Sequence, residues 1–215
     1  MKTILNFVFL LRSSFACLLI GFFSLSFANP HPTWGQKYFE NIQLSYGGVI
    51  AQRAKRLEAL ILKNAGRPVE EKLAAVNHFF NEVEYVSDLA HWGRSDYWQT
   101  PLETLIEFKG DCEDIAIAKY AALSAMGVPE EKLAIVYAKM RGKPHILLVY
   151  FPSKNADPFV LDSIGNKVIK ASAKAGLVPI YGFNGTSLWL IDRQMRKFGK
   201  VMPVPPSHKV VLNFA

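Results

Sequence analysis

One cysteine in this sequence stands among three acids, in the stretch GDCED at residues 110–114. Cys112 can attack an electrophile only as a thiolate, and the N-terminus of a helix favours that anion. Asp111 is a good helix N-cap, Asp114 follows at capping-box spacing, and an alanine-rich segment runs from there to Gly127. The sequence therefore predicts that Cys112 lies in the first turn of a helix. A buried, inert cysteine is the alternative that the residue type leaves open.

The three acids beside this cysteine oppose its ionisation. One carboxylate about 6 Å away costs a thiolate roughly 2–3 kcal/mol at an effective dielectric near 20, and a helix N-terminus returns only about 1 kcal/mol. Either the acids point away or a cation neutralises them. Hard oxygens on one tight turn suit calcium, so we expect a Ca²⁺ site formed by Asp111, Glu113 and Asp114, completed by carbonyls and water from 98–110. In the alternative, these acids serve only the helix start.

A nucleophilic cysteine also needs a base and a group that orients the base. His145 opens an expected strand, and Asp162 lies in the next one. If the register pairs 145 with 162, both side chains leave the same face of the sheet, where the helix end can bring Cys112 to them. The sequence thus suggests a Cys112–His145–Asp162 triad, with the Cys112 N–H as an oxyanion donor and 97–99 as the region for a second donor. A solvent-facing His145 and a turn-leading Asp162 remain alternatives.

The elements that would position these residues follow from periodicity and turn signals. Apolar residues at helical spacing precede the cysteine, and short β-branched and aromatic runs follow it. The expected class is α+β, with N-terminal helices and a central helix packed on an antiparallel sheet. The expected helices span 51–66, 67–86, a short segment after Thr100–Pro101, and 111–127; the expected strands span 132–140, 145–151, 159–163, 187–191 and 209–214.

The first 28 residues differ from the remainder. They contain Lys2 and Arg12, no acids, long apolar runs, and a small-x-small site that ends at Ala28. We expect a signal peptide over 1–28, followed by a single domain over 29–215 with no stable membrane insertion; an uncleaved anchor is the alternative. The formal net charge is +7, of which these two basic residues carry +2, leaving +5. Without a dense basic cluster, nucleic-acid binding is not expected.

The sequence motifs around the cysteine identify a protein family more specifically than the spacing of the cysteine to histidine and aspartate does. The run DYWQTPLETLIEFKGDCEDIAIAKYAALSAMGVP, followed by PHILLVYF and FVLDS, closely resembles the LapG-type bacterial transglutaminase-like cysteine proteases. The resemblance continues through VPIYGFNG and LWL, and it covers roughly residues 75–190. GDCEDIAIAKY is the most specific of these words.

This resemblance implies a papain-like, transglutaminase-like core in which Cys112 matches the nucleophile, His145 the base and Asp162 the orienting acid. It places calcium ligands on Asp111 and Glu113. Proline at 144 and serine at 163 depart from the A-H and L-D-N words of the family. The family further implies a periplasmic enzyme that clips a large surface adhesin near its N-terminus, releases biofilm cells, and is sequestered by an inner-membrane cyclic-di-GMP receptor of the LapD type.

Two other functional classes remain open on the sequence alone. A transglutaminase or amidase would use the same Cys-His-Asp core, with an amine in place of water as acceptor. A non-catalytic binding module could retain the fold, although the intact Cys112, His145 and Asp162 disfavour it.

Overall fold

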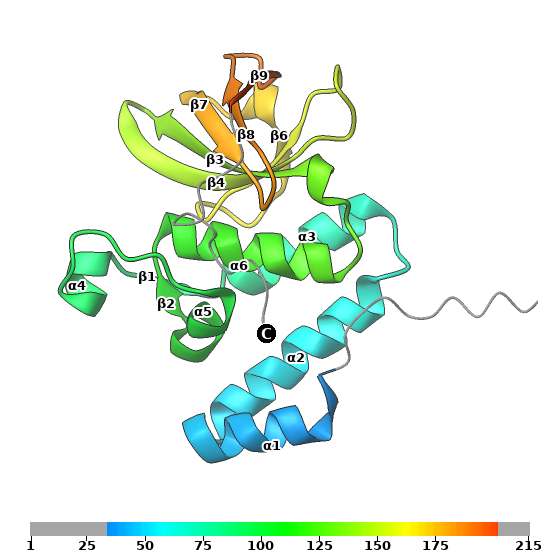
Figure 1. The fold of residues 1–215 in the computed structure, drawn as a ribbon, viewed down its shortest axis with the longest axis vertical. Coiled ribbons are helices and arrows are strands. Elements are labelled where there is room, and N and C mark those ends of the chain that lie inside the picture. Colours follow the sequence, from blue (N-terminus) through cyan, green and yellow to red (C-terminus); the bar gives the residue numbers. More distant parts are fainter. Residues whose placement is uncertain (1–33, 202–215) are drawn as a thin grey trace, which may run out of the picture.

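Helices form the N-terminal half of the protein, and a curved sheet forms the C-terminal half (Figure 1). The computed structural model describes residues 34–201; the expected signal peptide and the expected strand over 209–214 lie outside this range. None of the helices in the described range is long and apolar enough to cross a membrane. The α-helices are α1 (Gly35–Tyr46), α2 (Gly48–Asn64), α3 (Val69–Phe80), α4 (Asp88–Trp92), α5 (Pro101–Glu107) and α6 (Cys112–Ala125).

Two sheets are present in the described residues. Strands β1 (Glu84–Tyr85) and β2 (Lys109–Gly110) form a short parallel pair. The main sheet has the order β6-β5-β4-β3-β7-β8-β9, and each neighbouring pair is antiparallel. Its strands are β3 (Leu133–Met140), β4 (Lys143–Tyr150), β5 (Phe159–Leu161), β6 (Ile169–Lys170), β7 (Leu177–Phe183), β8 (Leu188–Ile191) and β9 (Lys197–Val201).

Helix α6 is central, lying between the other helices and the sheet (Figure 1). The sequence suggests a single apolar stripe on this helix, but the structure buries every residue from Glu113 to Leu123. This difference arises because α3 and α5 pack on the helix, and β3 and β4 cover it from the sheet side. Small alanine side chains let these elements approach closely, so the start of α6 is held rigidly against β4.

The predicted α+β architecture is confirmed, and several boundaries are corrected. The second expected helix ends at Phe80 instead of 86, because Glu84 and Tyr85 leave the helix to pair with β2. Helix α1 and strand β7 have no counterpart among the expected elements. Strand β7 lies beside β3, so the sheet extends on both sides of the predicted β3–β4–β5 meander.

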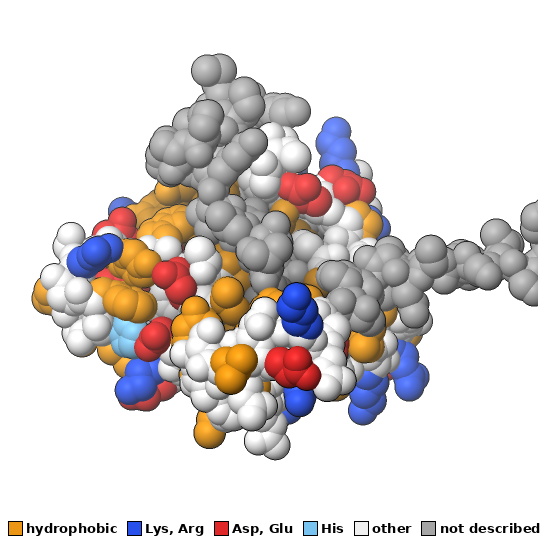
Figure 2. All heavy atoms as spheres, turned by 60° about the horizontal axis from the view of Figure 1, so that its bottom comes forward, with side chains coloured by type: hydrophobic (Ala, Val, Ile, Leu, Met, Phe, Trp, Pro, Cys, Tyr) orange, Lys and Arg blue, Asp and Glu red, His pale blue; other side chains and the backbone are white. Residues whose placement is uncertain are grey.

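The surface seen from the side of α1 and α2 carries basic and acidic side chains interspersed (Figure 2). Large apolar side chains are also exposed near the turn between these helices, among them Leu44 and Val49.

Candidate active site

The GDCED stretch forms the joint between β2 and α6. Asp114 is fully buried, and its carboxylate accepts one hydrogen bond from the backbone N–H of Asp111 (3.2 Å) and another from that of Gln99 (2.8 Å). A Cβ at Gly110 would lie 2.6 Å from Oδ2 of Asp114 and 3.0 Å from Nε2 of Gln99. Position 110 therefore requires glycine, because a larger residue would overlap the Asp114 carboxylate. Through its two hydrogen bonds, Asp114 fixes both the start of α6 and the 97–99 segment.

Cys112 is the first residue of α6, as the capping pattern predicts. Its thiol donates to Oε2 of Glu113 at 3.1 Å, and its Sγ accepts from the backbone N–H of Ile146 at 3.4 Å. Burial, followed by the negative charge of Glu113, raises the pKa of the Cys112 thiol, while the Ile146 N–H acts in the opposite direction. The acids thus do not all point away: Glu113 holds the sulfur in its thiol form.

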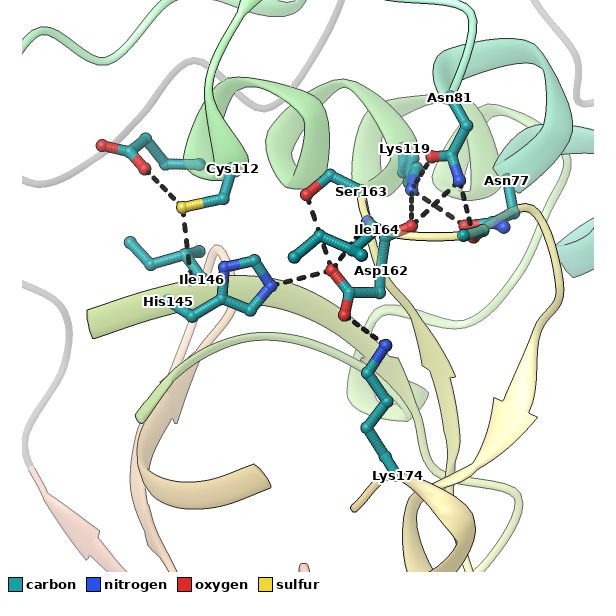
Figure 3. A network of polar contacts seen from close by, with 12 residues as sticks. Asn77, Asn81, Cys112, Lys119, His145, Ile146, Asp162, Ser163, Ile164 and Lys174 are labelled. Carbon is teal, nitrogen blue, oxygen red and sulfur yellow. Dashed lines mark hydrogen bonds and ion pairs between the residues drawn. The ribbon is translucent and has the colours of Figure 1, made fainter. Parts of the chain in front are cut away.

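His145 and Asp162 meet as a buried pair below this cysteine. Nε2 of His145 lies 2.8 Å from Oδ1 of Asp162, and the imidazole lies between Cys112 and the aspartate (Figure 3). The register differs from the 145–162 pairing considered above. Leu148 pairs with Leu161, and continuing that register sets Asp162 opposite Leu147, two residues from His145. A shift of two residues preserves the face from which a side chain leaves, so a diagonal contact still forms.

Asp162 is held by more than the histidine. Its Oδ1 also accepts from the backbone N–H of Ile164 (3.1 Å), and its Oδ2 forms a 2.6 Å ion pair with Nζ of Lys174. Burial by itself would raise the pKa of Asp162, but the hydrogen bonds from His145 and Lys174 outweigh it and hold that pKa well below its usual range. Asp162 is therefore an ionised acceptor, and Nε2 of His145 carries a proton toward it. The free Nδ1 faces the cysteine side.

Two further acids that sequence reasoning missed complete the cluster around Asp111. Ligand atoms of Asp88, Asp111 and Asp114 lie within 4.8 Å of one another, and those of Asp88, Asp96 and Glu113 form a second such group. Nothing in the sequence near Asp88 links it to the cysteine. The parallel pairing of Tyr85 with Gly110 brings it there.

These residues fit a hard divalent cation such as calcium. Oδ1 of Asp88 and Oδ1 of Asp111 are both buried without a hydrogen-bond partner, which is costly unless a cation or water satisfies them. Burial and neighbouring carboxylates raise the pKa of Asp111 to about 9, and burial raises that of Asp114 to about 7. Both carboxylate oxygens of Asp114 already accept from backbone N–H groups, so Asp88, Asp111 and Glu113 offer the freer oxygens.

The 97–99 segment lies against the start of α6, where a second oxyanion donor is expected. Oδ2 of Asp88 accepts from the Tyr97 N–H at 2.6 Å, and Asp114 accepts from the Gln99 N–H. Trp98 packs on the core, stacked on Phe183 with ring centroids 6.0 Å apart. Two acids of the cluster thus tether this segment.

Comparison with known proteins identifies the family of this chain. The model of the bacterial transglutaminase-like cysteine proteinases (BTLCP) matches residues 54–176. A search of curated proteins gives no match. Among solved structures, calcium-bound LapG of Legionella pneumophila is 34% identical, with a TM-score of 0.69, covering 79% of this chain and 93% of that one.

Two other LapG structures from the same organism are also similar. One is 39% identical with a TM-score of 0.65, covering 72% of this chain and 86% of that one. The EGTA-treated form is 35% identical with a TM-score of 0.70, covering 82% and 94%. Because the family model matches more than half of the chain and these structures span most of it, the protein belongs to the bacterial transglutaminase-like cysteine proteinases and has a LapG-like fold.

Proposed function

We propose that this protein is a calcium-dependent periplasmic cysteine endopeptidase in which Cys112 is the nucleophile, His145 the general base and acid, and Asp162 the orienting acid. The observation that carries the proposal is the arrangement at the start of α6. The sulfur at the helix N-terminus is contacted by the Ile146 N–H, and a buried His145–Asp162 pair lies beside it (Figure 3).

Each residue has a defined task in peptide hydrolysis. Nδ1 of His145 takes the proton of the Cys112 thiol, and the thiolate attacks the scissile carbonyl carbon. The C–N bond then breaks as the imidazolium gives its proton to the leaving amine, which leaves an acyl-enzyme. Water, deprotonated by the same nitrogen, attacks the thioester and releases Cys112. Asp162 keeps the ring in the required tautomer throughout, and the N–H of Cys112 faces the developing oxyanion.

The acid cluster explains why calcium would be required. Without a cation, Glu113 accepts the thiol hydrogen bond and its charge disfavours the thiolate. Asp88 and Asp111, which form one group with Asp114, and Glu113, which lies in a separate group with each of them, would hold the ion. When bound, the ion supplies positive charge that balances these carboxylates. The calcium-bound structure of the similar Legionella protein supports calcium as the ion.

The substrate, location and control that we propose follow from the similarity to LapG. The substrate is the N-terminal region of a large surface adhesin, and its cleavage would release the adhesin and disperse a biofilm. An inner-membrane cyclic-di-GMP receptor of the LapD type would sequester the protease. We propose that a signal peptide over 1–28 directs residues 29–215 to the periplasm.

Incubation of residues 29–215 with the N-terminal region of an adhesin from the same cell tests the proposal. With calcium, we expect two fragments from one substrate molecule; with chelator, we expect none until calcium is restored. Cys112→Ala and His145→Ala should abolish cleavage. His78→Ala, which changes an exposed histidine on α3, should cleave at the wild-type rate.

Two outcomes would overturn this assignment. Undiminished cleavage by Cys112→Ala would exclude the catalytic role of that residue. Cross-linked products in place of fragments would indicate a transglutaminase, in which a lysine amine replaces water in the second step.

A further inference from the structure

Two lysines contact Asp162, one at its side-chain carboxylate and one at its backbone carbonyl. The proposed protease mechanism assigns a role to neither lysine. Nζ of Lys174 contacts the carboxylate, while Nζ of Lys119 contacts the backbone carbonyl at 2.9 Å (Figure 3). The two lysines approach from different elements. Lys119 comes from the middle of α6, and Lys174 follows the short 3-10 helix η2 (Ala171–Ala173).

Lys119 holds the main chain of Asp162 from inside the core. It is fully buried, and its ammonium has three acceptors: Oδ1 of Asn77 (2.8 Å), Oδ1 of Asn81 (2.6 Å) and the Asp162 carbonyl. These three bonds use all three donors of the group. Asn81 also donates to the carbonyls of Asp162 and Gly165. This network ties α3 and α6 to the loop after β5 and explains why a lysine is tolerated in a central helix.

Lys174 holds the carboxylate from the outside, on a turn that is itself anchored. Asp157 accepts from both the backbone N–H (3.2 Å) and the hydroxyl (2.6 Å) of Ser172, and the Ala171 N–H donates to the Pro158 carbonyl. Asp157 and Pro158 directly precede β5, which leads to Asp162. The turn and the aspartate therefore belong to one connected unit, and the Lys174 side chain is only 16% exposed.

The carboxylate needs such a partner for two reasons. Rotation about χ2 of aspartate is broad, so a contact on Oδ2 is required to keep Oδ1 directed at His145. In addition, His145 is neutral during part of each catalytic cycle, and a buried carboxylate without a counter-ion is strongly disfavoured. The Lys174 ammonium stays positive while the imidazole gains and loses its proton.

We propose that Lys174 is a positioning residue that fixes the Asp162 carboxylate and, as its permanent counter-ion, limits how tightly His145 holds its proton. The inference rests on the proposed triad. The charged and titratable groups around the pair are Cys112, Glu113 and Lys119 on α6 and Lys174 on the turn after η2. Of these, Lys174 is the one that contacts the carboxylate.

The test compares Lys174→Met with wild type in saturating calcium. One carboxylate separates the Lys174 nitrogen from the His145 ring, so removing the lysine charge should shift the measured titration of that ring to higher pH. Nuclear magnetic resonance of the ring measures this without substrate. Because a more tightly held proton is transferred less readily to the leaving amine, we expect kcat to fall on the order of tenfold with KM unchanged. The acid limb of kcat/KM, which reports the neutral His145 base, should move to higher pH.

Three companion variants make the result specific. Lys174→Arg retains the charge and should keep the wild-type histidine titration. Lys167→Met changes an exposed lysine of the preceding loop and should match wild type in every measurement. Lys119→Met and Lys174→Met should both lower the thermal midpoint, because each leaves a buried partner group unpaired.

An unchanged His145 titration and unchanged kcat in Lys174→Met would overturn the inference, and so would identical behaviour of the Met and Arg variants. These results are distinguishable from failure of the proposed function. In that case the wild-type protein itself would not cleave, while the titration of His145 would still report on Lys174.

Discussion

Glu113→Gln gives the sharpest test of why three acids surround the cysteine. Oε2 of Glu113 lies 3.1 Å from Sγ of Cys112. At an effective dielectric of about 20, a carboxylate at that distance opposes the thiolate by about 5 kcal/mol, which is close to four pKa units. The hydrogen bond that the thiol donates and screening by water reduce the measurable effect. We expect the substitution to lower the pKa of Cys112 in calcium-free protein by at least about two units.

The assay is the rate of alkylation by iodoacetamide as a function of pH, since only the thiolate reacts. Wild type in chelator should react slowly until strongly alkaline pH, and calcium should move its titration to lower pH. Glu113→Gln should react at lower pH in chelator and should respond less to calcium, because a ligand is lost. Glu70→Gln, which changes an exposed acid on α3, provides the matched control.

Two results would refute this reasoning. One is a wild-type titration that is identical with and without calcium. The other is a Glu113→Gln variant whose thiol titrates where wild type does in chelator. Either result would mean that the acid cluster does not control the sulfur.

Three further predictions concern the acid cluster and its surroundings. The raised pKa values of Asp111 (about 9) and Asp114 (about 7) mean that the folded apo protein binds protons which the unfolded chain releases above about pH 4; the thermal midpoint in chelator should therefore fall from pH 5 to pH 9, and calcium should flatten this slope. Asp88→Asn should weaken calcium binding by at least about tenfold in calorimetry, since a buried unpaired carboxylate oxygen is lost; equal affinity would exclude Asp88 as a ligand. Gly110→Ala should destabilise the protein by about 1–3 kcal/mol in urea unfolding, because its Cβ would overlap Asp114, whereas Gly66→Ala meets nothing within 4 Å and should be neutral.

Local sequence patterns were sufficient to predict where helices α5 and α6 begin. The Thr100–Glu103 capping box that opens α5 is present, with the Thr100 N–H donating to Glu103 at 2.7 Å. Asp114 caps the Asp111 N–H at the predicted spacing, so Cys112 begins α6 as expected. In a capping box, each side chain bonds a backbone N–H that is only three residues away. Such short-range contacts can therefore be predicted from the sequence.

Strand β7 shows where local patterns failed. Its sequence contains Pro179 and Gly182, which normally argue against a strand. The structure accommodates both residues. Pro179 lies beside a register shift against β3, and a Cβ at Gly182 would lie 2.6 Å from Cδ1 of Ile191. Only the neighbouring strands make these residues acceptable, so no local signal could identify the strand.

The amino-acid sequence was enough to predict a cysteine at a helix start, the α+β class, and the family resemblance that the comparisons bear out. The tertiary structure decided which distant groups act on that start: Asp88 through the β1–β2 pairing, and Lys119 and Lys174 on opposite ends of Asp162. The physical reason is that charges and hydrogen bonds act over a few ångströms in space. A sequence specifies such proximity only through the packing of the whole domain.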